Sequence, residues 1–296
     1  MRDGARLVLC LFGWYACSAL FNVWNKEVLR SQPFPWAVSW CQLLAGVASV
    51  APFWVLGLRA PPRVEARWVA RKFGPIAGLH SIAHAAQVVG MGLGSVFMAH
   101  VVKATEPVAG TIVGIARGKR TPWKATAALV PVVAGISIAA SKPGVSTELI
   151  SAASIASLAS TVSGAVAKAL AKAVMTPQAK TEMRLDPGNT YALLTCCSCL
   201  LLAPPAWLVD GAALSRAPPE IALKLFLSGA AYYASNEFSF RVLDLLGPVP
   251  QAVANSAKRV FILLAAILLL GEAVTPRKAI GSSIALLGVL AYSLSK

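Results

Sequence analysis

Two adjacent cations, Lys258 and Arg259, lie deep inside the most apolar part of the sequence. The residues from Gly247 to Ala254 before them and the run from Val260 to Leu270 after them carry no charge. The whole segment is long enough to cross a bilayer, for which about 20 apolar residues are needed. Because a Lys or Arg at that depth costs about 2.5–3.5 kcal/mol, such residues persist where they have a partner. A small anion that binds and leaves is the first hypothesis for that partner.

The composition predicts an all-α integral membrane protein. The 296 residues are 57% hydrophobic and 13% charged, whereas soluble domains carry about 25% charged residues. Apolar stretches recur along the whole chain, leave no room for a separate soluble domain and predict ten membrane-spanning helices. The expected spans cover approximately residues 5–27, 34–58, 72–93, 96–116, 122–141, 148–175, 190–209, 222–243, 248–270 and 276–295.

The formal net charge of +15 does not require a nucleic-acid partner. Most basic residues fall in short loops between apolar segments, as the positive-inside rule predicts for a protein embedded in a bilayer. We expect both termini on that basic, inner side. The oligomeric state is open between monomer and homodimer. The loops of the N-terminal side carry Arg59, Arg63, Arg67, Arg71, Lys72, Arg117, Lys119, Arg120, Lys124, Lys180 and Arg184.

A repeated pattern divides the chain into two halves. The sequence Thr-Pro-Trp-Lys-Ala at 121–125 opens a segment that ends in Ser-Lys at 141–142, and Thr-Pro-Arg-Lys-Ala at 275–279 opens one that ends in Ser-Lys at 295–296. With five spans per half, the second half is inverted relative to the first, which predicts repeats at 1–142 and 143–296. The alternative is chance similarity between two apolar helices. The same offset of 154 residues brings Lys103 to within one residue of Lys258.

Lys103 is the third cation expected within the membrane. Glu106 follows three residues later, on the same face of a helix, and Pro107 is expected to kink that helix. Two interpretations are open: a Lys–Glu pair that satisfies itself, or a substrate-binding cation oriented by its carboxylate neighbour.

Further polar residues occur at helical spacing within the apolar spans. His84 and Gln87 could line a cavity, although His84 could equally be a histidine packed in the protein interior. Lys168 lies near the inner end of the sixth span, where a solvated helix end is the alternative. Glu237 has Arg241 one turn further on as an expected partner.

Catalytic and cofactor-dependent functions find no support in the sequence. It contains no Walker loop, no nucleophile elbow and no paired-carboxylate pattern, and the six cysteines lie in apolar segments without neighbouring metal ligands. We therefore expect neither an enzyme nor a metal or cofactor. We recognise no cleavable signal or transit peptide after Met1, so either none exists or the chain is a trimmed form.

Several segments together resemble the plastidic phosphate translocators, the triose-phosphate/phosphate translocator family of the drug/metabolite transporter superfamily. The resemblance extends over nearly the whole chain and implies ten helices in two inverted five-helix repeats. It also implies exchange of inorganic phosphate for a phosphorylated C3, C5 or C6 metabolite across a plastid envelope membrane. The matching segments are Phe-Asn-Val-Trp-Asn-Lys at 21–26, Pro-Phe-Pro at 33–35 with Ser39 and Gln42, His-x-x-Lys-x-x-Glu-Pro at 100–107, Ala-Asn-Ser-Ala-Lys-Arg-Val at 254–260, and residues 281–293.

The resemblance assigns the phosphate to Lys103, Lys258 and Arg259, and places His84 in the pocket. Other pocket positions depart from the family pattern. Gln87 replaces a small hydroxyl residue, Ser235 replaces a tyrosine, Ala167 with Lys168 beside it replaces an arginine, and Pro250-Gln251 replaces a Thr-His pair. The expected phosphate clamp is therefore kept, whereas the surroundings that contact the organic part are changed.

The sequence leaves the counter-substrate open among triose phosphate, 3-phosphoglycerate, phosphoenolpyruvate and sugar phosphates. One alternative is a nucleotide-sugar transporter of the Golgi or endoplasmic reticulum membrane. A second is a proton-coupled exporter of cationic drugs that uses Glu106 and Glu237, although three intramembrane cations oppose an acidic cavity. A third is a membrane scaffold that kept the fold without transport.

Overall fold

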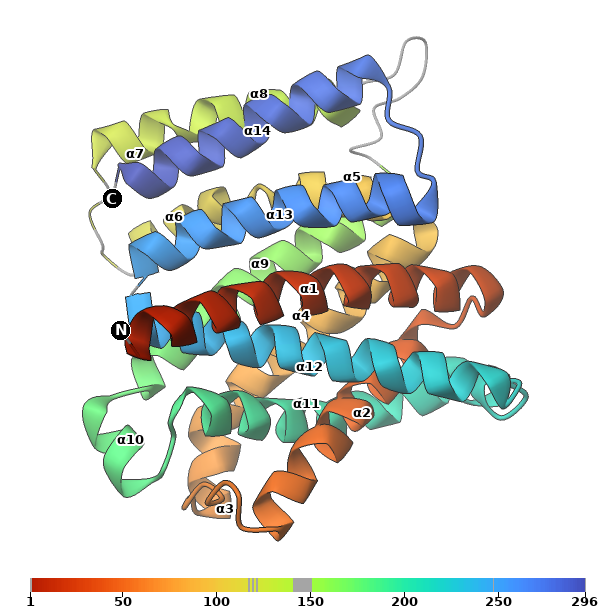
Figure 1. Ribbon diagram of the computed structural model, residues 1–296, viewed down its shortest axis with the longest axis vertical. Coiled ribbons are helices and arrows are strands. Elements are labelled where there is room, and N and C mark those ends of the chain that lie inside the picture. The colour runs from red at the N-terminus through yellow and green to blue at the C-terminus, as the bar shows by residue number, and fades with distance from the viewer. Residues whose placement is uncertain are drawn as a thin grey trace.

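In a computed structural model, all regular elements of the described residues are helices (Figure 1). The structure describes residues 2–116, 118, 120, 122–140, 151–246 and 248–295. The helices are α1 (Arg2–Ser31), α2 (Pro35–Val55), α3 (Ala66–Trp68), η1 (Val69–Phe73, a π-helical turn), α4 (Gly74–Leu93), α5 (Val96–Lys103), α6 (Glu106–Ala116), α7 (Trp123–Ala127), α8 (Leu129–Ala140), α9 (Ala152–Val174), α10 (Pro177–Glu182), α11 (Pro187–Leu214), α12 (Glu220–Leu246), α13 (Pro248–Leu270) and α14 (Pro276–Leu294).

The prediction of an all-α membrane protein is confirmed. Seven helical stretches of the described residues are long and apolar enough to cross a bilayer. They are Gly4–Ser31, Pro35–Val55, Ala66–Leu93, Val96–Ala116, Trp123–Ala140, Ala152–Ala171 and Pro187–Leu214. The count of ten spans stays a prediction. Parts of the repeat pattern and of the basic loops lie outside the described residues, as does the domain boundary at 142/143. The residues concerned are Arg117, Lys119, Thr121, Ser141, Lys142 and Lys296.

Local sequence signals set the helix starts. Side chains of Ser95, Thr176, Asp186 and Thr275 each accept a hydrogen bond from the backbone N–H three residues on. These contacts satisfy N–H groups that a first helical turn leaves unpaired. The third expected span begins earlier than residue 72, because α3 and η1 extend α4 back to Ala66.

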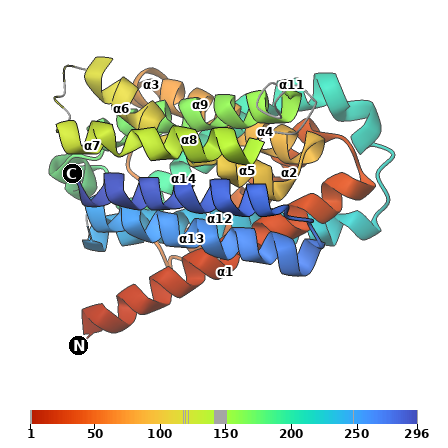
Figure 2. The same cartoon turned by 90° about the horizontal axis from the view of Figure 1, so that it is seen from above.

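The helices pack in pairs drawn from distant parts of the chain. α1 lies along α12, α4 along α9, α2 along α11 and α8 along α14. Both termini lie at the same end of the bundle in both views (Figures 1 and 2). We refer to this end as the terminal end and to the other as the distal end.

α8 and α14 cross with their backbones in contact. A Cβ atom on Gly135 would lie 2.4 Å from the backbone nitrogen of Ala285, and one on Gly281 would lie 2.4 Å from that of Ala139. The residue numbers rise along one helix as they fall along the other, so the two helices run antiparallel. Small residues permit this approach between membrane helices.

A break between α5 and α6 shapes the middle of the bundle. α5 ends at Lys103, the turn at Ala104–Thr105 follows, and α6 begins at Glu106. Pro107 has no N–H to continue the helical ladder, and the hydroxyl of Thr105 donates to the carbonyl of Val102 at 2.8 Å. Lys103 therefore ends one helix and Glu106 begins the next.

Candidate functional site

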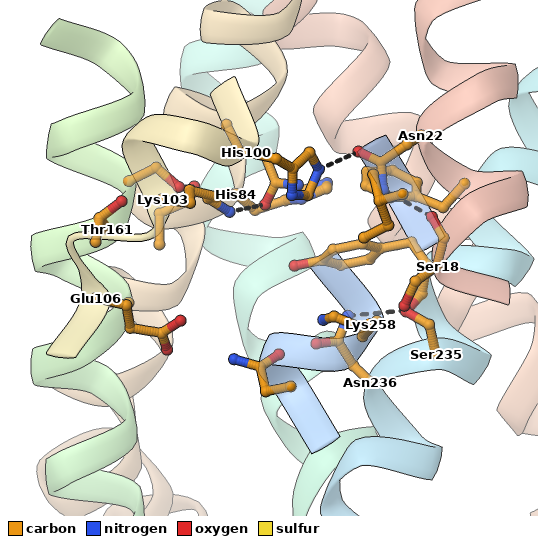
Figure 3. Close-up of a pocket in the computed structure, with 18 of the residues that line it drawn as sticks. Ser18, Asn22, His84, His100, Lys103, Glu106, Thr161, Ser235, Asn236 and Lys258 are labelled. Atoms are coloured by element: carbon orange, nitrogen blue, oxygen red, sulfur yellow. Dashed lines mark hydrogen bonds between the residues drawn. The ribbon is translucent and has the colours of Figure 1, made fainter. Parts of the chain in front are cut away.

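A partly open cavity of about 150 Å³ lies between α1, α4, α5, α6, α9, α12 and α13. Figure 3 shows its side chains converging from these separate helices. All seven residues that the sequence predicts for the site line this cavity: Lys103, Lys258, Arg259, His84, Gln87, Ser235 and Lys168. The structure thus gathers residues that are up to 175 positions apart in the chain.

Cations outnumber anions around the cavity. Its lining contains Lys103, Lys168, Lys258 and Arg259 but a single carboxylate, that of Glu106. Arg259 is 5% exposed, so its charge has little contact with solvent. Charge that is buried without full compensation costs free energy, and an anionic ligand would reduce this cost.

Glu106 bridges two of the cations. Its carboxylate accepts a hydrogen bond from Nη2 of Arg259 at 2.5 Å and also pairs with Nζ of Lys168. Of the two interpretations left open for Lys103, a Lys103–Glu106 pair that satisfies itself is not formed, because Lys103 binds Gln87 and Glu106 binds Arg259 and Lys168. The other interpretation, a substrate-binding cation oriented by its carboxylate neighbour, stays a prediction. The solvated interpretation of Lys168 is half correct: its side chain is exposed, yet it pairs with Glu106 at the edge of the cavity.

The remaining two cations have uncharged partners. Nζ of Lys103 donates to Oε1 of Gln87 at 2.5 Å, so the amide oxygen holds the ammonium group from the neighbouring helix α4. Nζ of Lys258 lies 4.9 Å from the centre of the Trp14 ring. Neither contact supplies a negative charge.

Imidazole and aromatic rings form another wall of the cavity. The ring of His84 lies 4.1 Å from that of Tyr232, with the planes tilted by 30°. Both ring nitrogens of His84 and Nε2 of His80 are buried without a hydrogen-bond partner. A buried polar atom left unpaired costs about 1–3 kcal/mol, so these nitrogens would gain from a hydrogen-bonding partner if the cavity opened to them.

Sequence reasoning did not assign several polar residues that line the same cavity. Nε2 of His100 lies 2.7 Å from Oδ1 of Asn22, and Thr161 and Tyr232 also contribute to the lining (Figure 3). Their signal in the sequence is a polar side chain within an apolar span. Ser235 faces the cavity as predicted, although its hydroxyl already donates to the carbonyl of Tyr232 at 3.1 Å.

A second cavity of about 290 Å³ adjoins the first. The two share Glu106, Lys168, Asn255 and Arg259. The second is also lined by residues near the end of α9 and the start of α13, which lie at the terminal end of the bundle. The second cavity therefore lies on the side of the cationic cavity that faces the end where both chain termini lie.

At the distal end, side chains tie the helices together. The carboxylate of Glu272 accepts from the backbone N–H groups of Val96 and Phe97, both at 2.8 Å, at the start of α5. Lys26 donates to the carbonyls of Met91 and Gly94 at 2.7 and 2.5 Å. These contacts join α1, α4, α5 and the segment after α13.

The expected pair of Glu237 and Arg241 is confirmed, at 2.5 Å. Arg59 binds the same carboxylate with two hydrogen bonds, of 2.5 and 3.1 Å, and Tyr233 donates to it at 2.7 Å. Glu237 is therefore a structural anion outside the cavity. Its full set of partners leaves it poorly suited to the proton-coupled export considered above.

Metal ligands do not gather in the part of the chain that the structure describes: no three His, Cys, Asp or Glu side chains form a group that could hold an ion. The described cavity is instead rich in basic side chains. An all-helical, multi-pass membrane protein with such a cavity has the properties of a membrane carrier for anions.

The chain belongs to the Triose-phosphate Transporter family, whose model matches residues 5–293. The resemblance inferred from the sequence is thereby confirmed. The chain is 28% identical to glucose-6-phosphate/phosphate translocator 1 of Arabidopsis thaliana, with 96% of this chain and 73% of that protein covered. It is 30% identical to the triose phosphate/phosphate translocator of Zea mays, with 96% and 70% covered.

A third relative is phosphoenolpyruvate/phosphate translocator 1 of Arabidopsis thaliana, 28% identical over 96% of this chain and 70% of that protein. All three relatives are named as chloroplastic proteins. One solved crystal structure shares the fold, with a TM-score of 0.55 and 16% sequence identity, over 98% of this chain and 97% of the other.

Proposed function

We propose that this protein is an antiporter that exchanges inorganic phosphate for a phosphorylated C3–C6 metabolite by alternating access. The observation that carries the proposal is the cavity in which Lys103, Lys258 and Arg259 converge with too little negative charge around them. Family membership and the phosphate translocators among the relatives support the same conclusion.

The three cations suit a phosphate group chemically. A guanidinium can bind two phosphate oxygens at once, and each ammonium group adds a compact charge with three donors. In the structure, Nη2 of Arg259 donates to the carboxylate of Glu106. A phosphate would compete with Glu106 for the guanidinium and with Gln87 for Lys103.

Strict exchange follows from the cost of closing an empty site. When the site closes to water, the unpaired cations lose solvation, which costs several kcal/mol. A bound phosphate supplies the missing negative charge and its oxygens accept the hydrogen bonds. Reorientation is therefore fast with a ligand bound and slow without one, which is the kinetic basis of antiport.

Ten spans in two inverted repeats, 1–142 and 143–296, are part of the proposal. Shifting the helical run Ala66–Leu93 by 154 residues gives 220–247, and α12 spans Glu220–Leu246. The same offset of 154 residues relates α4 to α12 and α1 to α9. The pair α4–α9 therefore corresponds to the pair α12–α1, and in each pair the two helices pack along each other. The antiparallel crossing of α8 and α14 is the geometry that an inverted pair requires.

Alternating access would then open the site to each membrane face in turn. In the described conformation a second cavity adjoins the cationic cavity on the side of the terminal end, whereas Glu272 and Lys26 tie helices together at the distal end. We assign it to the side of the cycle that faces the terminal end. The membrane we propose is the plastid envelope, because relatives from Arabidopsis thaliana and Zea mays are named chloroplastic.

The counter-substrate is to be found among small phosphorylated compounds. The relatives differ in their named partners, which include glucose 6-phosphate, xylulose 5-phosphate, triose phosphate and phosphoenolpyruvate. Gln87 binds the phosphate-site residue Lys103, and Ser235 lines the same cavity from α12. The departure at Gln87 therefore changes a partner of one of the three cations, whereas the departure at Ser235 changes the surroundings of the ligand.

Competition experiments test this function. Purified protein in liposomes loaded with phosphate is given labelled phosphate outside, together with an excess of one unlabelled compound. We expect inhibition by at least one of triose phosphate, 3-phosphoglycerate, phosphoenolpyruvate and hexose or pentose phosphates. Inhibition by nucleotide sugars alone, or no phosphate uptake by folded protein, would contradict the proposal.

A further inference from the structure

We propose that Trp14 is a positioning residue of the anion site, which holds the ammonium group of Lys258 through a cation–π contact. This inference rests on the proposed phosphate function and extends the site beyond the cavity lining. Trp14 lies in α1, one helical turn before the cavity residue Ser18, and is 2% exposed. Nζ of Lys258 lies 4.9 Å from the centre of its ring, within the range of cation–π attraction.

Lys258 differs from the other two cations of the clamp in the kind of partner it has. Lys103 donates to an amide oxygen and Arg259 to a carboxylate oxygen, both at 2.5 Å. Among the described residues, the Trp14 ring is the contact that the structure gives to the ammonium group of Lys258. A ring face attracts the positive charge without placing an oxygen where a phosphate oxygen would bind.

The two helices that carry this pair are fixed against each other on both sides of it. The hydroxyl of Tyr15 donates to the carbonyl of Ala254 at 2.7 Å, one turn before Lys258. The ring of Tyr15 also lies 5.2 Å from that of Phe261, almost one turn after it. The Trp14 ring therefore has a defined place relative to α13, as a group that orients a side chain must have.

This arrangement gives Trp14 a role that differs from those of Gln87 and Glu106. Their oxygens compete with a phosphate for Lys103 and Arg259, whereas the ring can keep its contact while the ammonium donors on the other side bind the ligand. The ring thus orients Lys258 before binding, and orientation in advance improves affinity because less freedom is lost on binding. We expect Trp14 to lower the half-saturation concentration for phosphate.

Graded fluorination of the Trp14 ring tests this role. Fluorine atoms withdraw electron density from the ring face but change the shape of the side chain little. Tryptophans with one to four fluorines are introduced at position 14, and phosphate–phosphate exchange is measured in liposomes. We expect the logarithm of the half-saturation concentration to rise steadily with the number of fluorines. Complete loss of the cation–π contact should raise the half-saturation concentration about 2- to 30-fold, which corresponds to roughly 0.5–2 kcal/mol.

Two comparisons separate this role from packing and from the proposed function. The same fluorination at Trp123, which is 75% exposed and remote from the described cavity lining, should leave the half-saturation concentration unchanged. Trp14→Phe should retain more affinity than Trp14→Leu, because it keeps an aromatic face. A flat fluorination series in an exchanging protein would overturn the role of Trp14 alone. Absence of phosphate exchange in the unsubstituted protein would overturn the proposed function, and this inference with it.

Discussion

Replacing Glu106 by Gln removes the single carboxylate described in the cavity lining while keeping the size of the side chain. The Arg259 side chain, 6% exposed, would lose its ion pair, whereas Lys168 is exposed and can turn to solvent. Removing one partner of a fully buried pair costs about 3–5 kcal/mol. Glu106 is itself 26% exposed and Gln keeps an acceptor oxygen. We therefore expect a loss of stability of about 1–3 kcal/mol without ligand.

Phosphate should reverse part of this loss. In the unsubstituted protein a phosphate must displace the Glu106 carboxylate from Arg259, whereas in Glu106→Gln it need not. We therefore expect tighter phosphate binding by the variant, and a tenfold lower dissociation constant would add about 1.4 kcal/mol of stabilisation at saturating phosphate. The assay is thermal unfolding of purified protein across a phosphate titration.

The matched control is Glu182→Gln, which removes an exposed carboxylate of α10 whose contact is a hydrogen bond from Gln178. It should change stability by less than about 0.5 kcal/mol and leave the phosphate response unaltered. Two results together would refute the reasoning. One is that, without phosphate, Glu106→Gln and the unsubstituted protein melt at the same temperature. The other is that phosphate raises the melting temperature of both proteins by the same amount.

Three further predictions follow from the described contacts. Lys258→Ala should abolish phosphate exchange in liposomes while the protein still purifies folded. The control Lys224→Ala, which removes an exposed ion pair, should exchange phosphate normally. Exchange retained by Lys258→Ala would count against the phosphate clamp. Gly281→Val should lower the melting temperature markedly, because a Cβ there would lie 2.4 Å from the backbone of α8. In the control Gly110→Ala the new Cβ meets no atom within 4 Å, so this variant should melt near the original temperature. Equal melting temperatures of the two variants would refute this packing. Glu272→Gln should lose about 0.5–2 kcal/mol of stability, because the charged group that caps two N–H groups at the start of α5 becomes neutral. Thermal unfolding measures this loss, and unchanged stability would show that the cap contributes nothing.

The membrane fold was predictable because apolar length is a strong signal. The same holds for the clamp: cations such as Lys103 and Lys258 are rare within apolar spans, and the 154-residue offset relates them. The structure places both in one cavity, as that relation leads one to expect. Whether they bind phosphate stays a prediction for the exchange experiments.

The contacts within the site were less predictable. Helical spacing suggested a pair of Lys103 and Glu106, but each of these side chains binds a residue from another helix. Glu106 instead binds Arg259, 153 residues away, and helical spacing carries no information about such a contact. Trp14 was missed for a similar reason, since a tryptophan in an apolar span gives no sign of the cation opposite it.

The measurement that tests the central claim most directly compares two sets of liposomes containing the purified protein. One set is loaded with phosphate, the other has no exchangeable anion inside, and labelled phosphate is added outside both. Phosphate antiport predicts rapid uptake into the loaded vesicles and almost none into the empty ones. Equal uptake into both would contradict obligatory exchange, and no uptake into either by folded protein would contradict the assignment of Lys103, Lys258 and Arg259 as a phosphate site.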